Sequence, residues 1–242
     1  MIRVYPDIEA LSRGAAELFA DEARRGVAAR GRFIVLLAGG ETPRRCYELL
    51  AEAPVRDRIP WGAVHVFWGD ERCVPDDDPR SNAAMARRAL LDHVPVPEAQ
   101  IHPISCAGAP HEGAVAYEGL LRAFFGDGPP RFDLVFLGLG ENGHTASLFP
   151  GTAVLEERER WAAEVYVAGE GLHRVTLTAP AINQAALVAF LAAGEKKAAV
   201  LKEVLEGTAD PRILPARLIS PAHGELRWLI DRPAARLLRH EA

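Results

Sequence analysis

The sequence contains few cysteines, and their number and spacing argue against two kinds of small-domain scaffold. Only Cys46, Cys73 and Cys106 occur among 242 residues, an odd number with no CxxC pair. Neither a disulfide framework nor a zinc knuckle is therefore expected, and a reduced, cytoplasmic setting fits best. HExxH and Cys/His ligand sets are lacking too, so we expect no metal and no other cofactor.

Patterns typical of secretion and of membrane spans are also lacking. Residues 1–5 do not show the basic-then-apolar start of a signal peptide. The longest nearly apolar run, 185–194, is about half as long as a membrane span requires. A net charge of −5 indicates neither a nucleic-acid nor an anionic-membrane partner. An anionic small molecule would need a local cluster of Arg and Lys.

Helix and strand signals alternate along the chain. Residues 7–30 have apolar side chains at helical spacing, with Asp7 as a cap and Gly31 as an end. Residues 33–37 form an unbroken apolar run, which is typical of a strand buried on both faces. The pair Thr42-Pro43 reads as the cap and first residue of the next helix.

Strand and helix signals continue to alternate to the end of the chain. This alternation predicts an α/β fold with a mostly parallel sheet. A polar loop is expected at 69–82, and 126–130 is the best alternative domain boundary, although it reads as a turn. We therefore expect a single domain over 1–242. The further strands are predicted at 64–68, 134–137, 164–168, 173–178, 187–192 and 228–230, and the further helices near 82–91, 112–125 and 195–205.

In open parallel sheets, ligands bind beyond the carboxyl ends of the strands, which directs attention to the loops 38–43, 69–82 and 138–150. In the first loop, Gly39 and Gly40 let backbone amides approach an anion at a helix start. The Gly-Lys-Ser/Thr ending of a P-loop is absent. A turn without a ligand is the alternative reading.

The second loop carries charged side chains directly after a buried strand. Arg72 is suited to binding a phosphate through two parallel hydrogen bonds. The alternative is that it pairs with Asp70 and only holds the loop in place. The acidic run 76–78 lacks the alternate spacing of a calcium loop, so a solvated loop is expected there. Cys73 has no evident His partner and is expected to be an inert thiol.

The third loop, GLGENGHTASLFPG, contains the strongest candidate for catalysis. Its GxGxxG start is a weak dinucleotide match, because Pro150 stops any helix within two turns. His144 follows a glycine at the mouth of the sheet, where neutral imidazole suits proton abstraction from water; a structural histidine is the alternative. Ser147 lies outside a GxSxG elbow, which disfavours a serine esterase.

Two later cations complete the candidate set. Arg174 begins a predicted strand, and Lys197 lies at a predicted helix start after a strand. A cation is unfavourable for the helix at that end, so its placement makes sense if an anion binds there. Ordinary surface positions are the alternative reading.

These motifs together resemble the 6-phosphogluconolactonase family, within the glucosamine/galactosamine-6-phosphate isomerase superfamily. The matching segments are LAGGETP, FWGDERCVP with a later SN, DLVFLGLGENGHTASLFPG, RVTLTAPAIN and GEKKAAVL, followed by LPA and WLID. GHTASLFP is the most specific of them. The resemblance implies a three-layer, doubly wound, Rossmann-like α/β domain similar to glucosamine-6-phosphate deaminase.

The resemblance also implies a chemistry, namely hydrolysis of 6-phospho-D-glucono-1,5-lactone in the oxidative pentose phosphate pathway. Arg72 and Lys197 would hold the phosphate, with Arg174 as a further contact. Asp70 would contact the substrate or orient Arg72, and His144 would activate the water. The remaining implied contacts to the substrate are Gly39, Gly40, Thr42, Asn142 and Gly143. A monomer or a homodimer is expected.

The chain departs from the family pattern and leaves two rivals. Asn142 stands where the family usually has Asp, and Ala38 and Glu41 stand where Ser is common. A glucosamine-6-phosphate deaminase or isomerase would have Tyr in place of Arg72 and a catalytic Glu in place of Phe149. A non-catalytic sugar-phosphate sensor would keep the phosphate site and lose His144.

Overall fold

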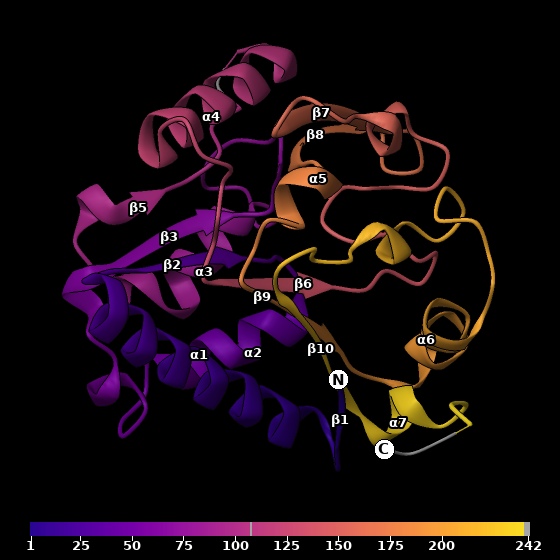
Figure 1. The fold of residues 1–242 in the computed structure, drawn as a ribbon, viewed down its shortest axis with the longest axis horizontal. Coiled ribbons are helices and arrows are strands. Elements are labelled where there is room, and N and C mark those ends of the chain that lie inside the picture. The colour runs from indigo at the N-terminus through magenta and orange to yellow at the C-terminus, as the bar shows by residue number, and fades with distance from the viewer. Residues whose placement is uncertain (107, 240–242) are drawn as a thin grey trace.

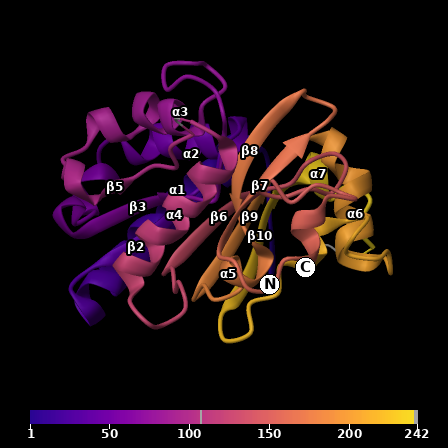
Figure 2. The same ribbon diagram turned by 90° about the horizontal axis from the view of Figure 1, so that it is seen from above.

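The computed structural model describes residues 1–106 and 108–239, and its main sheet is parallel throughout. The strand order is β1-β10-β9-β6-β2-β3-β5. Chain order runs outward from β2 on one side and then restarts at β6 on the other side (Figures 1 and 2). The strands are β1 (Ile2–Tyr5), β2 (Phe33–Leu37), β3 (Val64–Trp68), β5 (Ile101–His102), β6 (Leu134–Gly138), β9 (Leu187–Ala192) and β10 (Glu225–Asp231).

Helices cover the sheet in the manner expected of a doubly wound fold. One face carries α1 and α2, while α4 packs with a smaller sheet on the other face (Figure 1). This arrangement confirms the predicted three-layer α/β fold. The helices are α1 (Ile8–Arg30), α2 (Glu41–Leu50), α3 (Asn82–Ala89), α4 (Pro110–Phe125), α5 (Ala179–Ile182), α6 (Ala198–Glu206) and α7 (Arg232–Ala235). None of the helices in the described residues is long and apolar enough to cross a membrane.

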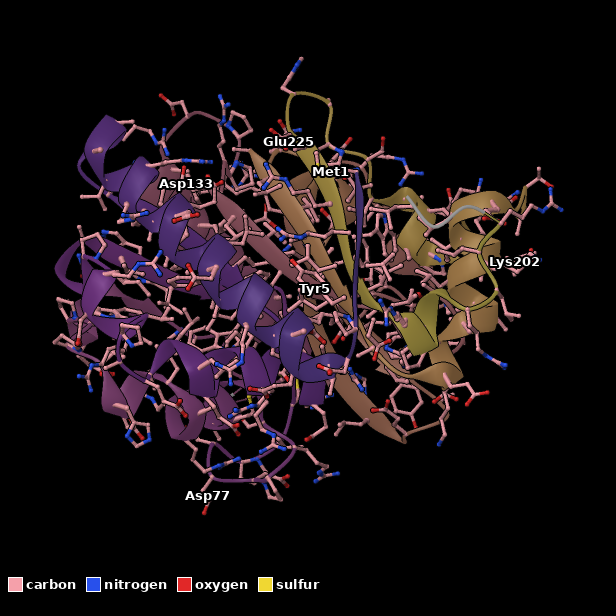
Figure 3. All side chains as sticks on the ribbon, turned by 90° about the horizontal axis from the view of Figure 1, so that it is seen from below. Met1, Tyr5, Asp77, Asp133, Lys202 and Glu225 are labelled. Atoms are coloured by element: carbon pink, nitrogen blue, oxygen red, sulfur yellow. A yellow bond between two sulfur atoms is a disulfide. The ribbon has the colours of Figure 1, made fainter. Side chains whose placement is uncertain are left out.

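The longest helix, α1, shows how the sequence dictates its own packing. The Asp7 side chain accepts a hydrogen bond from the Ala10 N–H, and Gly31 ends the helix with φ of 74°, as the sequence predicted. Phe19 on its buried face packs edge-on to Phe33 of β2, at 5.3 Å between ring centroids. Figure 3 shows α1 lying across the strands.

A second, antiparallel sheet replaces part of the loop expected at 69–82. Its strand order is β4-β8-β7, with β4 at Asp70–Arg72, β7 at Ala162–Val167 and β8 at Leu172–Leu177. A strand of three residues is too short to be recognised by alternation of apolar side chains. The rest of the loop agrees with expectation, since Asp77 is exposed and projects at the molecular edge (Figure 3).

The predicted start of α2 differs from the structure. Helix α2 begins at Glu41 rather than at Pro43, because Gly40, whose φ of 102° favours glycine, serves as the cap in place of Thr42. Residues 139–152 form turns and no helix. Strand β1 had no counterpart among the predicted elements.

The expectation about cysteines is wrong for two of the three residues. Cys73 and Cys106 form a disulfide, with Cα atoms 5.1 Å apart across 33 positions of sequence. Folding brings the segment after β4 beside the segment before α4, which sequence spacing does not reveal. Cys46 is buried as a free thiol, and burial raises its pKa. The cysteine-based argument for a reducing compartment therefore loses its basis.

The disulfide leads to a prediction about thiol counts and stability. Denatured, unreduced protein should show one reactive thiol, and reduced protein should show three. Reduction should lower the free energy of unfolding by roughly 3–4 kcal/mol, because the bond closes a loop of about 33 residues in the unfolded chain. Thiol titration and denaturant unfolding measure both quantities. Cys46→Ser is the control, for which the unreduced count should be zero; three thiols before reduction would contradict the bond.

Candidate active site

The three predicted loops converge on one cavity of about 460 Å³ at the carboxyl ends of the strands. It lies where strand order reverses between β2 and β6, because the loops after these neighbours lead to opposite sides and leave a crevice. Figure 3 shows Asp133 and Glu225, at strand beginnings, at the opposite edge from Asp77. The predicted site residues that line the cavity are Gly39, Gly40, Thr42, Asp70, Arg72, His144, Arg174 and Lys197.

The cavity holds a cluster of cations with unmatched hydrogen-bond donors. Arg72 of β4 lies directly opposite Arg174 of β8 in the antiparallel ladder, a like-charge pairing that is unfavourable by itself. The Nε groups of both are buried without a partner. Within the part of the chain that the structure describes, Lys197 has no ion-pair partner. Such a cluster is suited to binding an anion.

Asp70 fixes one of these arginines rather than the other. The Ser147 hydroxyl donates to the Asp70 carboxylate at 2.5 Å, and Arg174 Nη1 lies 3.4 Å from the same oxygen. The Asn82 amide donates to the Asp70 carbonyl at 2.8 Å. Arg72 instead donates to the Arg80 carbonyl. The idea that Asp70 orients Arg72 is therefore wrong, because its carboxylate points toward β8.

Asn142 determines which imidazole nitrogen of His144 carries a proton. Its Oδ1 lies 2.6 Å from Nδ1 of His144 and 3.2 Å from the backbone N of the same residue. A backbone N–H only donates, so the amide atom facing both groups is the oxygen. Nδ1 must then be the protonated nitrogen, and Nε2 retains the lone pair. Asn142 is not among the residues that line the cavity, whereas His144 is.

The surroundings of His144 hold its ring in place and keep it neutral. The ring stacks on Phe149 at 4.1 Å between centroids, and a Cβ at Gly140 would lie 2.1 Å from Nδ1. Burial is the main cause that lowers the pKa of His144 to about 4; Arg174 and Lys197 lower it further, while Asp70 opposes them. The imidazole is therefore unprotonated at neutral pH.

The His144 loop is shaped by its backbone. Gly143, with φ of 80°, packs under Leu214, and its carbonyl accepts from the Ala216 N–H at 2.9 Å. Gly143 thus supports the loop from outside the cavity lining. Ala146 has φ of 47° without being glycine, a strained conformation often found at functional sites.

The first loop contributes backbone N–H groups, rather than side chains, to the cavity. Gly40 caps α2, whose first N–H groups have no partner within the helix. A Cβ at Gly39 would lie 1.9 Å from Asn82 Oδ1, so no larger residue fits there. Glu41 is exposed and pairs with Arg44 on the same helix. The free N–H groups give this end of the cavity a positive potential.

Comparison with known proteins identifies the family. The model for glucosamine-6-phosphate isomerases/6-phosphogluconolactonase matches residues 6–228. The chain belongs to this family. It is 47% identical over 221 residues to a 6-phosphogluconolactonase from Synechocystis sp., an alignment that covers 89% of this chain and 88% of that protein.

Solved structures agree with this membership. The 6-phosphogluconolactonase of Trypanosoma brucei superposes with a TM-score of 0.86 at 30% identity, covering 98% of both chains. A monomeric glucosamine-6-phosphate deaminase superposes with a TM-score of 0.83 at 22% identity, covering 98% of this chain and 99% of that chain. The latter shows the shared fold alone, which confirms the fold similarity implied by the sequence motifs.

Three side chains near the site had not been assigned a role from sequence. Ser147 and Phe149 lie inside the most specific family segment, but their partners, Asp70 and His144, become neighbours only on folding. Glu170 contacts Arg174 from a hairpin turn, and no sequence motif marks it. The part of the chain that the structure describes contains no group of three or more potential metal ligands.

The role of Asn142 leads to a prediction about pH dependence. Replacing Asn142 by Asp keeps the oxygen that fixes the tautomer and adds a negative charge, which stabilises the imidazolium. The pKa of His144 in the free enzyme should rise by roughly 1–3 units, and the acidic limb of kcat/KM should move to higher pH by the same amount.

The ratio of variant to wild-type kcat/KM between pH 4 and 8 measures this shift. Titration of a phosphorylated substrate affects both proteins equally and cancels in the ratio. The ratio should fall as the pH is lowered from neutral, since the variant protonates first. A ratio that stays flat over this range would contradict the role of His144 as the titrating base.

Proposed function

We propose that this protein hydrolyses 6-phospho-D-glucono-1,5-lactone to 6-phosphogluconate with water activated by His144 and without a metal. The main support is the tautomer of His144, whose unprotonated Nε2 belongs to a ring that lines a cavity rich in cations. The relatives from Synechocystis sp. and Trypanosoma brucei, which are 47% and 30% identical to this chain, are named 6-phosphogluconolactonases. That name specifies this substrate. The comparisons and the site chemistry point to the same reaction.

The proposed reaction begins with proton transfer to His144. Nε2 takes a proton from water while the water oxygen attacks the lactone carbonyl carbon, and Asn142 Oδ1 stabilises the Nδ1–H of the resulting imidazolium. The N–H groups at the start of α2 are available to the sugar oxygens or the developing oxyanion. The bond from that carbon to the ring oxygen then breaks, and the imidazolium returns its proton to the ring oxygen.

Phosphate binding would improve His144 as a base. In the free protein Arg174 and Lys197 both lower the pKa of His144, because they disfavour a third positive charge nearby. A phosphate dianion held by these side chains and by Arg72 would offset their charge and raise the pKa toward its ordinary value. The base then approaches the range in which proton transfer is most efficient.

The cavity residues favour lactone hydrolysis over the two rival readings. Arg72 and Phe149 occupy positions where a deaminase would require Tyr and a catalytic Glu, so the acid and base groups for ring opening and deamination are missing. A sensor has no need for an oriented, unprotonated imidazole.

We further propose a cytoplasmic location, a single domain over 1–242, and no nucleic-acid or membrane partner.

Substrate comparison tests the proposal directly. The background-corrected rate should be high on 6-phosphoglucono-1,5-lactone and much lower on unphosphorylated gluconolactone, because only the former engages the cations. Glucosamine 6-phosphate should yield no ammonia, and EDTA should leave the rate unchanged. Equal rates on both lactones would remove the phosphate site from the proposal, and ammonia release would favour the deaminase.

Two alanine variants separate the base from the phosphate grip. His144→Ala should lower kcat by roughly 10²–10⁴ and leave binding of 6-phosphogluconate nearly intact. Arg72→Ala should mainly raise KM, because a charge-assisted contact to phosphate is lost. Steady-state kinetics and calorimetric binding of the product measure both effects. Near-normal turnover of His144→Ala would exclude it as the base, and an unchanged KM in Arg72→Ala would exclude that phosphate contact.

A further inference from the structure

The outer end of Arg174 is covered by a carboxylate from the hairpin that joins β7 to β8. Glu170 lies in the turn 168–171, and its two oxygens accept hydrogen bonds from Arg174 Nη2 at 2.6 and 2.5 Å. The Arg174 side chain is 5% exposed, whereas that of Glu170 is 42% exposed. The carboxylate therefore lies on the solvent side of a buried guanidinium.

The contacts of the Arg174 guanidinium leave little capacity for a ligand. Nη1 is directed at Asp70 and Ser147, at 3.4 and 3.3 Å, and Nη2 is held by Glu170. Nε is buried and has no partner. A phosphate grips a guanidinium through two parallel N–H groups, which on the free edge are Nε–H and one N–H of Nη2. Such a grip requires Glu170 to release Nη2.

The turn that carries Glu170 has few contacts to lose. Gly169 and Gly171 flank it, and a Cβ at either position would meet no atom within 4 Å. Gly171 adopts φ of 64°, which favours glycine. The backbone of the turn is held by hydrogen bonds at its base, from Glu170 N to Val167 O at 3.0 Å among them. Sparse packing of this kind permits local displacement.

Glu170 also experiences the same cations as the proposed phosphate. The hydrogen bond from Arg174 is the main cause that lowers the pKa of Glu170, and the charges of Arg174 and Arg72 contribute in the same direction. The carboxylate is therefore ionised at neutral pH. It provides a counter-charge for the opposed pair Arg72 and Arg174 in the free protein.

We propose that Glu170 competes internally with the phosphate of the ligand for Arg174 and thereby determines specificity. In the free protein it occupies Nη2, and it is displaced by a dianion that also reaches Arg72 and Lys197. An uncharged sugar lactone brings no charge to displace it, so discrimination in favour of phosphorylated ligands follows. The inference rests on the phosphate-binding role proposed above.

Binding measurements on charge-neutral variants test this competition. Calorimetry at fixed pH and ionic strength would compare inorganic phosphate and 6-phosphogluconate on wild type, Glu170→Gln and Glu170→Ala. Both variants should bind both ligands about three- to tenfold more tightly, with Ala at least as tight as Gln because it leaves no acceptor on Nη2. KM for the phosphorylated lactone should fall, whereas KM for unphosphorylated gluconolactone should not, because that lactone brings no charge to Arg174.

Glu164→Gln is the matched control. Glu164 lies on β7 of the same hairpin, is also 42% exposed, and has its carboxylate 4.0 Å from His173 rather than on Arg174. Its removal should change binding less than twofold. Tightening by Glu164→Gln equal to that by Glu170→Gln would mean a general charge effect and would overturn the inference.

Two further results of the binding measurements would overturn the competition between Glu170 and phosphate. Weaker binding in both Glu170 variants, most of all in Ala, would show that Glu170 positions Arg174 for the ligand and would overturn competition. Failure of wild type to bind either phosphate or 6-phosphogluconate would overturn the phosphate site itself, and the competitor with it. Failure of the competition alone would leave wild-type binding intact, so the two failures are distinguishable.

Discussion

The opposition of two arginines across β4 and β8 is the constraint on which the site depends. Arg72 and Arg174 are direct partners in an antiparallel ladder, and such a pair is unfavourable without negative charge nearby. Buried charges must be paired or hydrogen-bonded to be tolerated. The protein meets this requirement for Arg174 with Asp70 and Glu170, whereas Arg72 has no ion-pair partner among the described residues and its side chain donates to the Arg80 carbonyl. The cavity is therefore formed, but the positive charge of Arg72 is not balanced by an ion pair.

The two sheets have separate tasks in meeting this constraint. The parallel sheet, buried on both faces, creates the crevice at the reversal between β2 and β6 and places the Gly39 and His144 loops there. The small antiparallel sheet brings the arginines to the same place, because Arg72 and Arg174 come from strands that pair across more than a hundred positions of sequence. The proposed base and Lys197 thus follow strands of the parallel sheet, whereas the two arginines proposed to hold phosphate belong to the small sheet.

Local signals allowed much of this arrangement to be predicted. Strands such as Phe33–Leu37 were identifiable because they are unbroken apolar runs, and α1 because a cap and a glycine define its ends. The rule that ligands bind at strand ends selected the three loops that converge on the cavity. The domain count and the roles of individual residues remain predictions.

Features that depend on tertiary contacts could not be predicted. The disulfide joins Cys73 to Cys106 only because folding brings two separate segments together. Strand β4 is too short for a pattern, so the partner of Asp70 was expected to be Arg72 and proved to be Arg174. Glu170 lies in a turn whose sequence resembles any solvated hairpin. The disulfide and the contact of Asp70 depend on segments that meet only on folding, whereas Glu170 lies four residues before Arg174 and was missed because no motif marks it.

The replacement of the usual family Asp by Asn142 fits the same charge argument. His144 needs an acceptor at Nδ1 to fix its tautomer, and an amide oxygen supplies one without charge. With Asn142, the pKa of His144 is lowered mainly by burial, is raised by Asp70 and Glu170, and is lowered further by Arg174 and Lys197. These cations are the groups that a phosphate would neutralise. In the proposed mechanism the basicity of His144 would therefore respond to phosphate binding at Arg174 and Lys197, a coupling that a fixed carboxylate beside the imidazole would weaken.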